Sequence, residues 1–174
     1  MLDFQIRAAT KNDWPQIVSI YNYYIVNSAF NFEQQVHSIE SLASWFSNFL
    51  DGGPYQLLVG ANKQGEIVGY ATTTPFSAII GYQSSFNISI YCEPKYKGRG
   101  IGSRLLNEII DRSKLISFAH RLYAGITVSN DLSINLFQKF GFIKVAHFTE
   151  VGYKFDRYWD VIWFEKHIAP TTQG

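Results

Sequence analysis

The segment from Ile88 to Leu106, ISIYCEPKYKGRGIGSRLL, constrains the fold of this chain more than any other. An uncharged alternating strand is followed by a basic, glycine-rich turn and then by apolar residues at helical spacing. Gly98, Gly100 and Gly102 allow the backbone to approach a ligand closely, and a helix that begins there presents unpaired N–H groups and the positive end of its dipole. The segment therefore predicts a binding site for phosphate or pyrophosphate.

Two well-known glycine motifs do not fit this segment. A P-loop would end in Gly-Lys-Ser/Thr, whereas Gly102 is followed by Ser103 and Arg104. A dinucleotide fingerprint requires an acidic residue about twenty positions later, and the range Ile116–His120 contains no carboxylate. An anion cradle of another kind remains, with a plain turn between strand and helix as the alternative. Basic residues support the cradle, because the segment contains Lys95, Lys97, Arg99 and Arg104 while the whole chain has a formal net charge of only +1.

The composition predicts one globular domain. With 174 residues, of which 47% are hydrophobic and 17% charged, the chain can bury one sizeable core. We expect this domain to span residues 1–168 and the tail 169–174 to be disordered. The N-terminal residues MLDFQIR lack the apolar run of a secretion signal, so the expected compartment is the cytoplasm.

Several partner classes are disfavoured by composition. Fifteen Lys and Arg are balanced by fourteen Asp and Glu, which argues against nucleic-acid binding. The uncharged span 67–92 is too polar for a membrane helix, so no membrane association is expected. The single cysteine, Cys92, excludes an internal disulfide, and the four histidines are too far apart in sequence for a local metal motif. Cys92 is interpreted as a small buried residue, with contact to a thioester ligand as the alternative.

Periodicity and turn residues predict an alternation of strands and helices. Thr10 and Asp13 indicate the capping pair of a first helix, and Ser38 indicates the start of a second. Asn130 is a good N-cap for the last expected helix, which ends at Gly141. The strands are expected at Phe4–Ala9, Tyr55–Ala61, Ile67–Thr74, Ser85–Tyr91, Arg121–Val128, Phe142–Val151 and Tyr158–Lys166, and a further helix is expected from Ile101 to Ile110.

The glycine turn resembles the acetyl-CoA site of the GNAT superfamily of N-acetyltransferases, which reads Q/R-x-x-G-x-G/A, with Lys97, Gly100 and Gly102 in the matching places. The resemblance covers nearly the whole chain and is strongest to the phosphinothricin and methionine sulfoximine acetyltransferase group. Its matching segments are IRAAT, IYNYYIVNSAFNF, VGYA, SNDLSINLFQKFGF and VGYKFDRYWDV. It implies an α/β fold, α+β in some schemes, with a mixed, mostly antiparallel sheet of about seven strands flanked by about four helices.

The resemblance also implies a function and a set of site residues. The chain would transfer acetyl from acetyl-CoA to the primary amine of a small molecule, such as an amino acid or its analogue. The backbone of Ile90, Tyr91 and Cys92 would line the pantetheine arm, and Asn130 and Ser133 would contact the cofactor. The pyrophosphate would be held by Lys97, Gly98, Arg99, Gly100, Ile101 and Gly102. The acceptor would lie beside Phe30, Phe32, Thr74, Tyr153 and Tyr158, although plain packing explains the aromatic residues equally well.

The chain departs from the family pattern at three places. The glutamate proposed as base in relatives is replaced by Asn87, the histidine or tyrosine of the later helix by Phe137, and the acceptor-binding arginine is absent near Ser77. Asn87 and Glu33 are therefore the candidate catalytic residues, Asn87 through hydrogen bonding and Glu33 as a base acting through water. The alternatives are a CoA-binding protein with lost or weak transfer activity, or an acetyltransferase for protein N-termini or aminoglycosides. By resemblance, a homodimer is expected.

Overall fold

The computed structural model describes residues 3–49 and 52–168, and within them seven strands form one sheet in the order β1-β2-β3-β4-β5-β7-β6. Of the strand pairs in these residues, β4 and β5 run parallel and the others antiparallel. The expected disordered tail 169–174 lies outside the described residues. The strands are β1 (Phe4–Ala8), β2 (Leu57–Asn62), β3 (Ile67–Pro75), β4 (Ser85–Cys92), β5 (Arg121–Thr127), β6 (Ile143–Lys154) and β7 (Arg157–His167).

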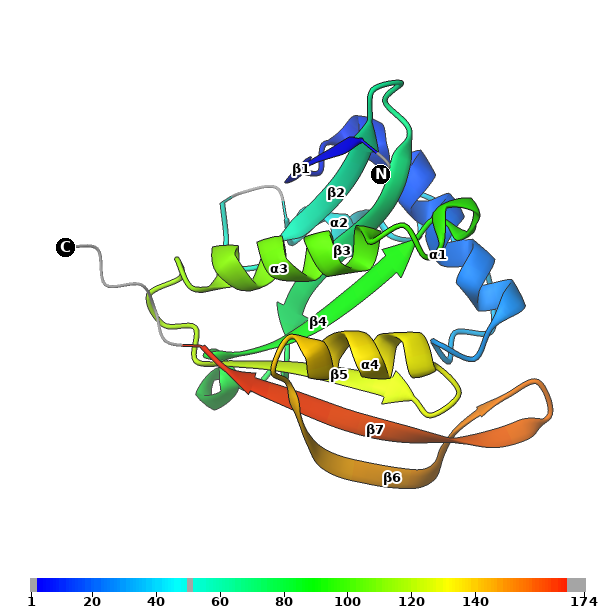
Figure 1. Cartoon of the computed structure of the whole chain (residues 1–174), viewed down its shortest axis with the longest axis vertical. Helices are drawn as coiled ribbons and strands as arrows, with labels where there is room; N and C mark the ends of the chain where they lie inside the picture. Colours follow the sequence, from blue (N-terminus) through cyan, green and yellow to red (C-terminus); the bar gives the residue numbers. More distant parts are fainter. Residues whose placement is uncertain (1–2, 50–51, 169–174) are drawn as a thin grey trace.

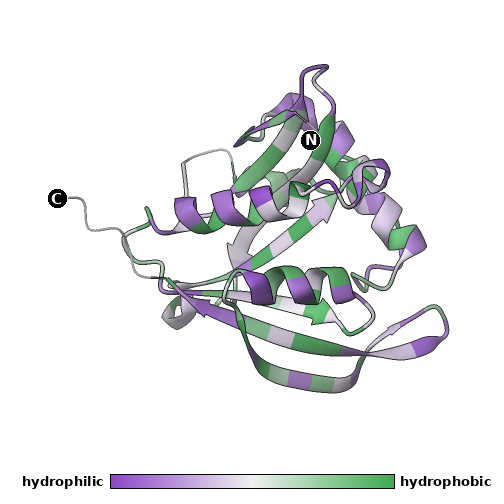
Figure 2. Cartoon of the chain, viewed as in Figure 1, coloured by the Kyte–Doolittle hydropathy of each residue, from purple (hydrophilic) through white to green (hydrophobic). Residues whose placement is uncertain are grey.

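Helices cover both faces of the sheet (Figure 1). One face packs against α3 (Ile101–Ser113) and α4 (Asp131–Lys139), and the other against α1 (Trp14–Asn27) and the short α2 (Ala43–Ser47). Two apolar clusters fill these layers, because the sheet is buried on both sides. Figure 2 shows the result as hydropathy, with hydrophobic residues along the middle of the sheet and hydrophilic positions recurring along α3. The expected α/β fold with a mixed sheet is confirmed.

Local bonds explain where the helices begin. The predicted capping box is present, since the Asp13 carboxylate accepts from the Thr10 N–H at 2.7 Å, although a short 3₁₀ turn, Lys11–Asp13, precedes α1. The second helix is shorter than predicted and begins at Ala43 instead of Ser38. Ser38 still caps a turn, because its hydroxyl and that of Ser41 accept from each other's backbone N–H at 3.1 and 3.0 Å in the reciprocal pattern of a capping box, but residues 39–42 form a turn and the regular helix follows it.

The separation of β4 from β5 creates space inside the fold. These strands pair at three positions only, from Ser85–Arg121 to Asn87–Tyr123. Beyond Asn87, one edge of β4 has no strand partner among the described residues. Backbone groups at an unpaired edge are available to a ligand. Within the described residues, no helix combines the length and the apolar composition that crossing a membrane requires.

Candidate functional site

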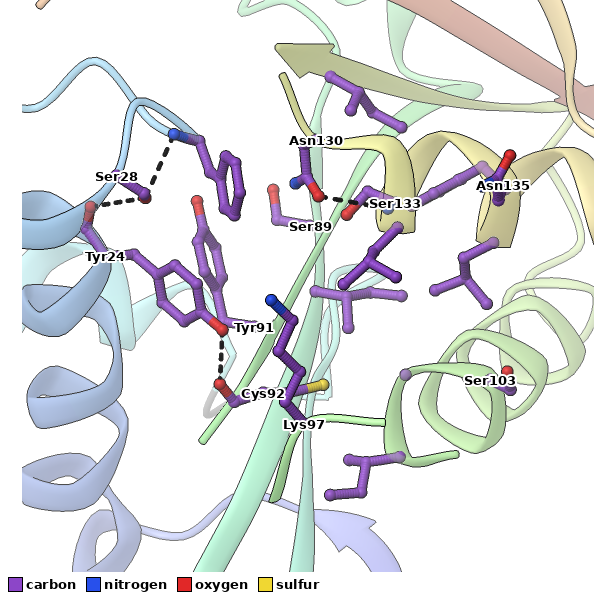
Figure 3. A pocket seen from close by; sticks show the side chains of 18 of the residues that line it. Tyr24, Ser28, Ser89, Tyr91, Cys92, Lys97, Ser103, Asn130, Ser133 and Asn135 are labelled. Atoms are coloured by element: carbon purple, nitrogen blue, oxygen red, sulfur yellow. Dashed lines mark hydrogen bonds between the residues drawn. The ribbon is translucent and has the colours of Figure 1, made fainter. Parts of the chain in front are cut away.

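A cavity of about 670 Å³ lies where β4 and β5 separate (Figure 3). Its walls come from the end of α1, the free edge of β4, β5, the glycine turn, the first turn of α3 and the length of α4. Eleven of the residues expected to bind a ligand line it, namely Phe30, Ile90, Tyr91, Cys92, Lys97, Gly98, Gly100, Ile101, Gly102, Asn130 and Ser133. The fold therefore brings together residues that span a hundred positions of the chain.

The glycine turn forms one end of this cavity. Gly98 and Gly100 both have φ near +78°, a left-handed conformation that glycine adopts without strain, and Gly100 is the N-cap of α3. A Cβ added to either would meet no atom within 4 Å, so the space beside them is open. The N–H groups of the first turn of α3 have no helical partner. The turn thus has the glycine conformations and the open space that an anion cradle requires.

The structure divides the four basic residues of this segment into two pairs. Lys95 forms an ion pair with Glu66, and the Arg104 guanidinium donates to the Phe4 carbonyl at 2.8 Å. Lys97 and Arg99 have no carboxylate within 4 Å among the described residues. Lys97 lines the cavity and is directed into its mouth in Figure 3, whereas Arg99 lies outside the lining and over the Tyr96 ring. Of these four residues, Lys97 therefore supplies the positive charge at the cavity, and Lys139 of α4 adds a second lysine to the lining.

The free edge of β4 offers backbone groups to the cavity. The Ser85 carbonyl and the Glu93 N–H bond to the β3 side, so the odd-numbered residues between them direct their backbone groups to β3. The backbone groups of Ile88, Ile90 and Cys92 consequently face the opening. One of them is occupied, because the Tyr24 hydroxyl donates to the Cys92 carbonyl at 2.7 Å.

Asn130 has the capping role that its residue type predicts. Its Oδ1 accepts from the Ser133 N–H at 3.3 Å at the start of α4, and both residues line the cavity. At Gly102, an added Cβ would lie 3.2 Å from the Leu136 Cδ2 atom. Glycine therefore allows α3 and α4 to approach each other beside the cavity.

The two candidate catalytic residues lie outside the cavity lining. The Asn87 Nδ2 donates to the Pro75 carbonyl at 3.2 Å, and its Oδ1 is buried without a hydrogen-bond partner. The Glu33 carboxylate is half-exposed and lies 3.6 Å from the His37 Nε2. Phe137 does line the cavity, but it is buried and its ring packs against Phe142. The described lining contains no Asp, Glu or His side chain, and the described residues form no cluster of three potential metal ligands.

Of the residues expected around the acceptor, only Phe30 lines the cavity, at the end of α1. The Phe32 ring packs on Gly152, where no side chain would fit beside it. Lys154, buried to 4% exposure, donates to the carbonyl and to the Oδ1 of Asn31 at 3.0 and 3.2 Å, and burial lowers its pKa. Loop 28–33 is therefore fastened to the β6–β7 hairpin. Thr74, Tyr153 and Tyr158 lie outside the cavity lining.

The end of α1 is the part of the lining that the sequence did not reveal. Tyr23, Tyr24, Asn27 and Ser28 line the cavity, and the Ser28 hydroxyl donates to the Tyr24 carbonyl at 2.9 Å. The spacing of Tyr24 from Ile17 and Tyr21 along α1 is that of an apolar helix face. A tyrosine in an apolar face is a weak signal of such a site, because its hydroxyl needs a polar partner when it is buried.

Comparisons with known proteins agree with this geometry. The family model for the acetyltransferase (GNAT) domain matches residues 6–163. A phosphinothricin N-acetyltransferase from Streptomyces coelicolor is 36% identical over 95% of this chain and 97% of its own length. An L-methionine sulfoximine/L-methionine sulfone acetyltransferase from Salmonella typhimurium is 30% identical over 95% and 97% of the two chains. The crystal structure of a GNAT phosphinothricin acetyltransferase from Sinorhizobium meliloti in complex with acetyl-CoA superimposes with a TM-score of 0.90, at 27% identity and 98% and 91% coverage.

Proposed function

This chain belongs to the GNAT family of acetyltransferases, and we propose that it transfers acetyl from acetyl-CoA to the primary amine of an amino acid or a close analogue. The observation that carries the proposal is the cavity between β4 and β5, which ends at a glycine turn with an open anion cradle. The relatives named above act on phosphinothricin and on methionine sulfoximine, which supports an acceptor of amino-acid type.

The residues present fit acetyl-CoA. Gly98 and Gly100 leave room for a diphosphate, the first turn of α3 supplies N–H donors, and the Lys97 ammonium lies at the mouth of the cavity. The backbone groups of Ile88 and Ile90 would accept and donate hydrogen bonds to the amides of the pantetheine arm. When bound, acetyl-CoA supplies a thioester carbonyl that a neutral amine can attack.

The polar groups of the cavity favour an acceptor whose amine loses its proton easily. Because the described lining contains no carboxylate or imidazole, no ordinary base is available there. An α-amine with a pKa of about 8 needs about 1.4 kcal/mol to be neutral at pH 7, whereas a lysine-type amine near 10.4 needs about 4.6 kcal/mol. We therefore propose α-amines as acceptors, which amino acids and protein N-termini both provide.

A CoA-binding protein with lost or weak transfer activity is the second candidate. Two observations favour it, namely the aromatic Phe137 in the α4 wall and the position of Asn87 outside the lining. Neither side chain can take up or release a proton in the required pH range.

One experiment tests both candidates. Purified protein is titrated with acetyl-CoA in a calorimeter, and thiol release is then followed with a panel of amino acids, phosphinothricin, methionine sulfoximine, short peptides and an aminoglycoside. The proposal expects binding together with thiol release that depends on an amino-acid acceptor. Tight binding without acceptor-dependent thiol release would support the second candidate, and release with peptides or the aminoglycoside alone would change the substrate class.

We propose that the chain works as a homodimer in the cytoplasm, where an unpaired cysteine stays reduced. The edge strand β6 supports self-association, because several of its apolar side chains are exposed, including Val145, Phe148 and Val151. Sedimentation velocity would detect the dimer. Phe148→Glu is expected to shift it to monomer, and a monomeric unaltered protein would refute the proposal.

A further inference from the structure

Few side chains of the described cavity lining could transfer a proton. Seven side chains of this lining are titratable, namely Tyr23, Tyr24, Tyr91, Tyr96, Cys92, Lys97 and Lys139. Acetyl transfer to an amine requires one proton to pass from nitrogen to sulfur, so one of these groups or a solvent molecule must carry that proton.

Most of these groups already donate a hydrogen bond within the protein or lie at the rim of the cavity. The Tyr24 hydroxyl donates to the Cys92 carbonyl, and the Tyr96 hydroxyl donates to the Glu66 carboxylate at 2.5 Å. Tyr23, Lys97 and Lys139 are exposed to solvent. Within the described residues, this leaves Tyr91 and Cys92 as the two groups at the inner wall.

The pleat of β4 separates these two residues. Cys92 and Ile90 pack with the cluster on the α3 face, and burial raises the pKa of the Cys92 thiol to about 11. Tyr91 packs with the cluster on the α1 face, together with the loop that carries Phe30. The α1 face is the one that the predicted acceptor wall borders. Tyr91 is therefore the titratable residue of the inner wall on the acceptor side.

Neighbouring rings hold Tyr91 in one position. Its ring lies 5.4 Å from the Tyr70 and Tyr21 rings and 5.3 Å from the Tyr24 ring, measured between centroids. Burial raises the pKa of Tyr91 to about 12, and hydrogen bonding to the Asn31 side chain offsets part of this effect, so the phenol stays protonated at neutral pH. The Tyr24 hydroxyl drawn beside it in Figure 3 donates instead to the Cys92 carbonyl. A phenol held between rings, with its hydroxyl beside the Asn31 amide, thus lines the cavity.

We propose that the Tyr91 hydroxyl relays the proton of the transfer step, an inference that rests on the proposed function. The nitrogen lone pair forms the new C–N bond, and the C–S bond breaks with its electron pair on sulfur. Tyr91 gives its proton to sulfur while it takes one from nitrogen, and the phenol is unchanged at the end. A concerted exchange is required, because a free phenolate at this position is costly at neutral pH.

Tyr91→Phe tests the relay, because it removes only the hydroxyl. We expect kcat to fall about 100-fold or more, the typical contribution of a positioned acid or base. The KM for acetyl-CoA and its calorimetric Kd are expected to remain unchanged, because the relay uses the hydroxyl only in the transfer step. The matched control is Tyr21→Phe, which removes a hydroxyl from the same ring cluster outside the cavity lining, and its kcat is expected to stay unchanged.

A second measurement does not depend on activity. The protein is labelled at the tyrosine Cζ atoms for NMR, and the Tyr91 resonance is assigned by its absence in Tyr91→Phe. CoA and desulfo-CoA are then added to separate samples. The relay expects the resonance to move more with CoA than with desulfo-CoA, because the hydroxyl then meets sulfur. Ser89 of β4 also places a hydroxyl in the cavity lining, so Ser89→Ala tests whether another hydroxyl serves the same step. Equal shifts, an unchanged kcat in Tyr91→Phe, or a loss of kcat in Ser89→Ala that equals the loss in Tyr91→Phe would overturn the inference. If the unaltered protein releases no thiol, the proposed function fails and the resonance shifts alone decide the placement of Tyr91.

Discussion

Alanine at position 100 is expected to weaken acetyl-CoA binding far more than it weakens the fold. Gly100 has φ near +78°, where an L-residue is strained by about 1 kcal/mol. An added Cβ meets no atom within 4 Å, so no steric clash adds to this strain. For a chain of this length, about 1 kcal/mol lowers the thermal midpoint by roughly 2–4 °C.

The effect on binding is larger because the new methyl group enters the open space of the cradle. Losing one hydrogen bond between a backbone N–H and a charged diphosphate costs about 1.5–3 kcal/mol, which raises Kd roughly 10- to 150-fold. With acetyl-CoA at about 100 times Kd, the unaltered protein gains about 2.7 kcal/mol, or roughly 5–11 °C. A variant that binds about 100-fold more weakly gains about 0.4 kcal/mol, or roughly 1 °C, at the same concentration.

Gly65 supplies a matched control for this measurement. It also has φ near +78°, and an added Cβ there likewise meets no atom within 4 Å, but it lies in the β2–β3 turn and outside the cavity lining. Gly65→Ala is expected to lose the same few degrees without ligand and to keep the full shift with acetyl-CoA. Differential scanning fluorimetry compares the two variants, and equal ligand-induced shifts in Gly65→Ala and Gly100→Ala would refute the anion cradle.

Three further changes test other parts of the structure. Lys97→Gln is expected to raise the Kd for acetyl-CoA and to flatten its dependence on salt, while Lys95→Gln, which removes an ion-paired lysine, leaves both unchanged in calorimetry. Gly152→Ala is expected to destabilise the protein in urea by about 1–3 kcal/mol, because the new Cβ overlaps the Phe32 ring, and the added change Phe32→Ala should restore part of this loss. An arginine hydrogen bond lowers the pKa of Asp13, so its stabilisation is present above the unfolded pKa of about 3.9 and is lost as pH falls through the folded value. Urea midpoints should therefore decline with acid less steeply in Asp13→Asn, and identical slopes would contradict this assignment.

Local chemistry made much of the fold predictable. Strand alternation, the capping pair at Thr10 and Asp13 and the glycine turn depend on neighbours close in sequence, and the structure contains all three. The exception is the segment after Ser38, where residues 39–42 form a turn with bonds between residues three apart and the regular helix begins only at Ala43. Helix periodicity does not distinguish such a turn from a full helical turn.

Charge pairing and face assignment required the tertiary structure. The sequence does not distinguish the four basic residues of the glycine-turn segment from one another. In the structure, Lys95 forms an ion pair with Glu66 and Arg104 donates to the Phe4 carbonyl, and both partners are distant along the chain. Glu33 and Asn87, the two candidate catalytic residues, both lie away from the cavity lining.

The sequence alone determined the conformation of the glycine turn, because a glycine-rich turn before a helix takes its shape from adjacent residues, whatever surrounds it. Only the tertiary structure decided which side chains share the cavity. The divergence of β4 from β5, the end of α1 and the hairpin that holds loop 28–33 meet there through long-range packing. Tyr91 illustrates the difference. The alternation of side chains along β4 predicts the face on which it lies, whereas the rings that surround it, those of Tyr21, Tyr24 and Tyr70, come from distant parts of the chain.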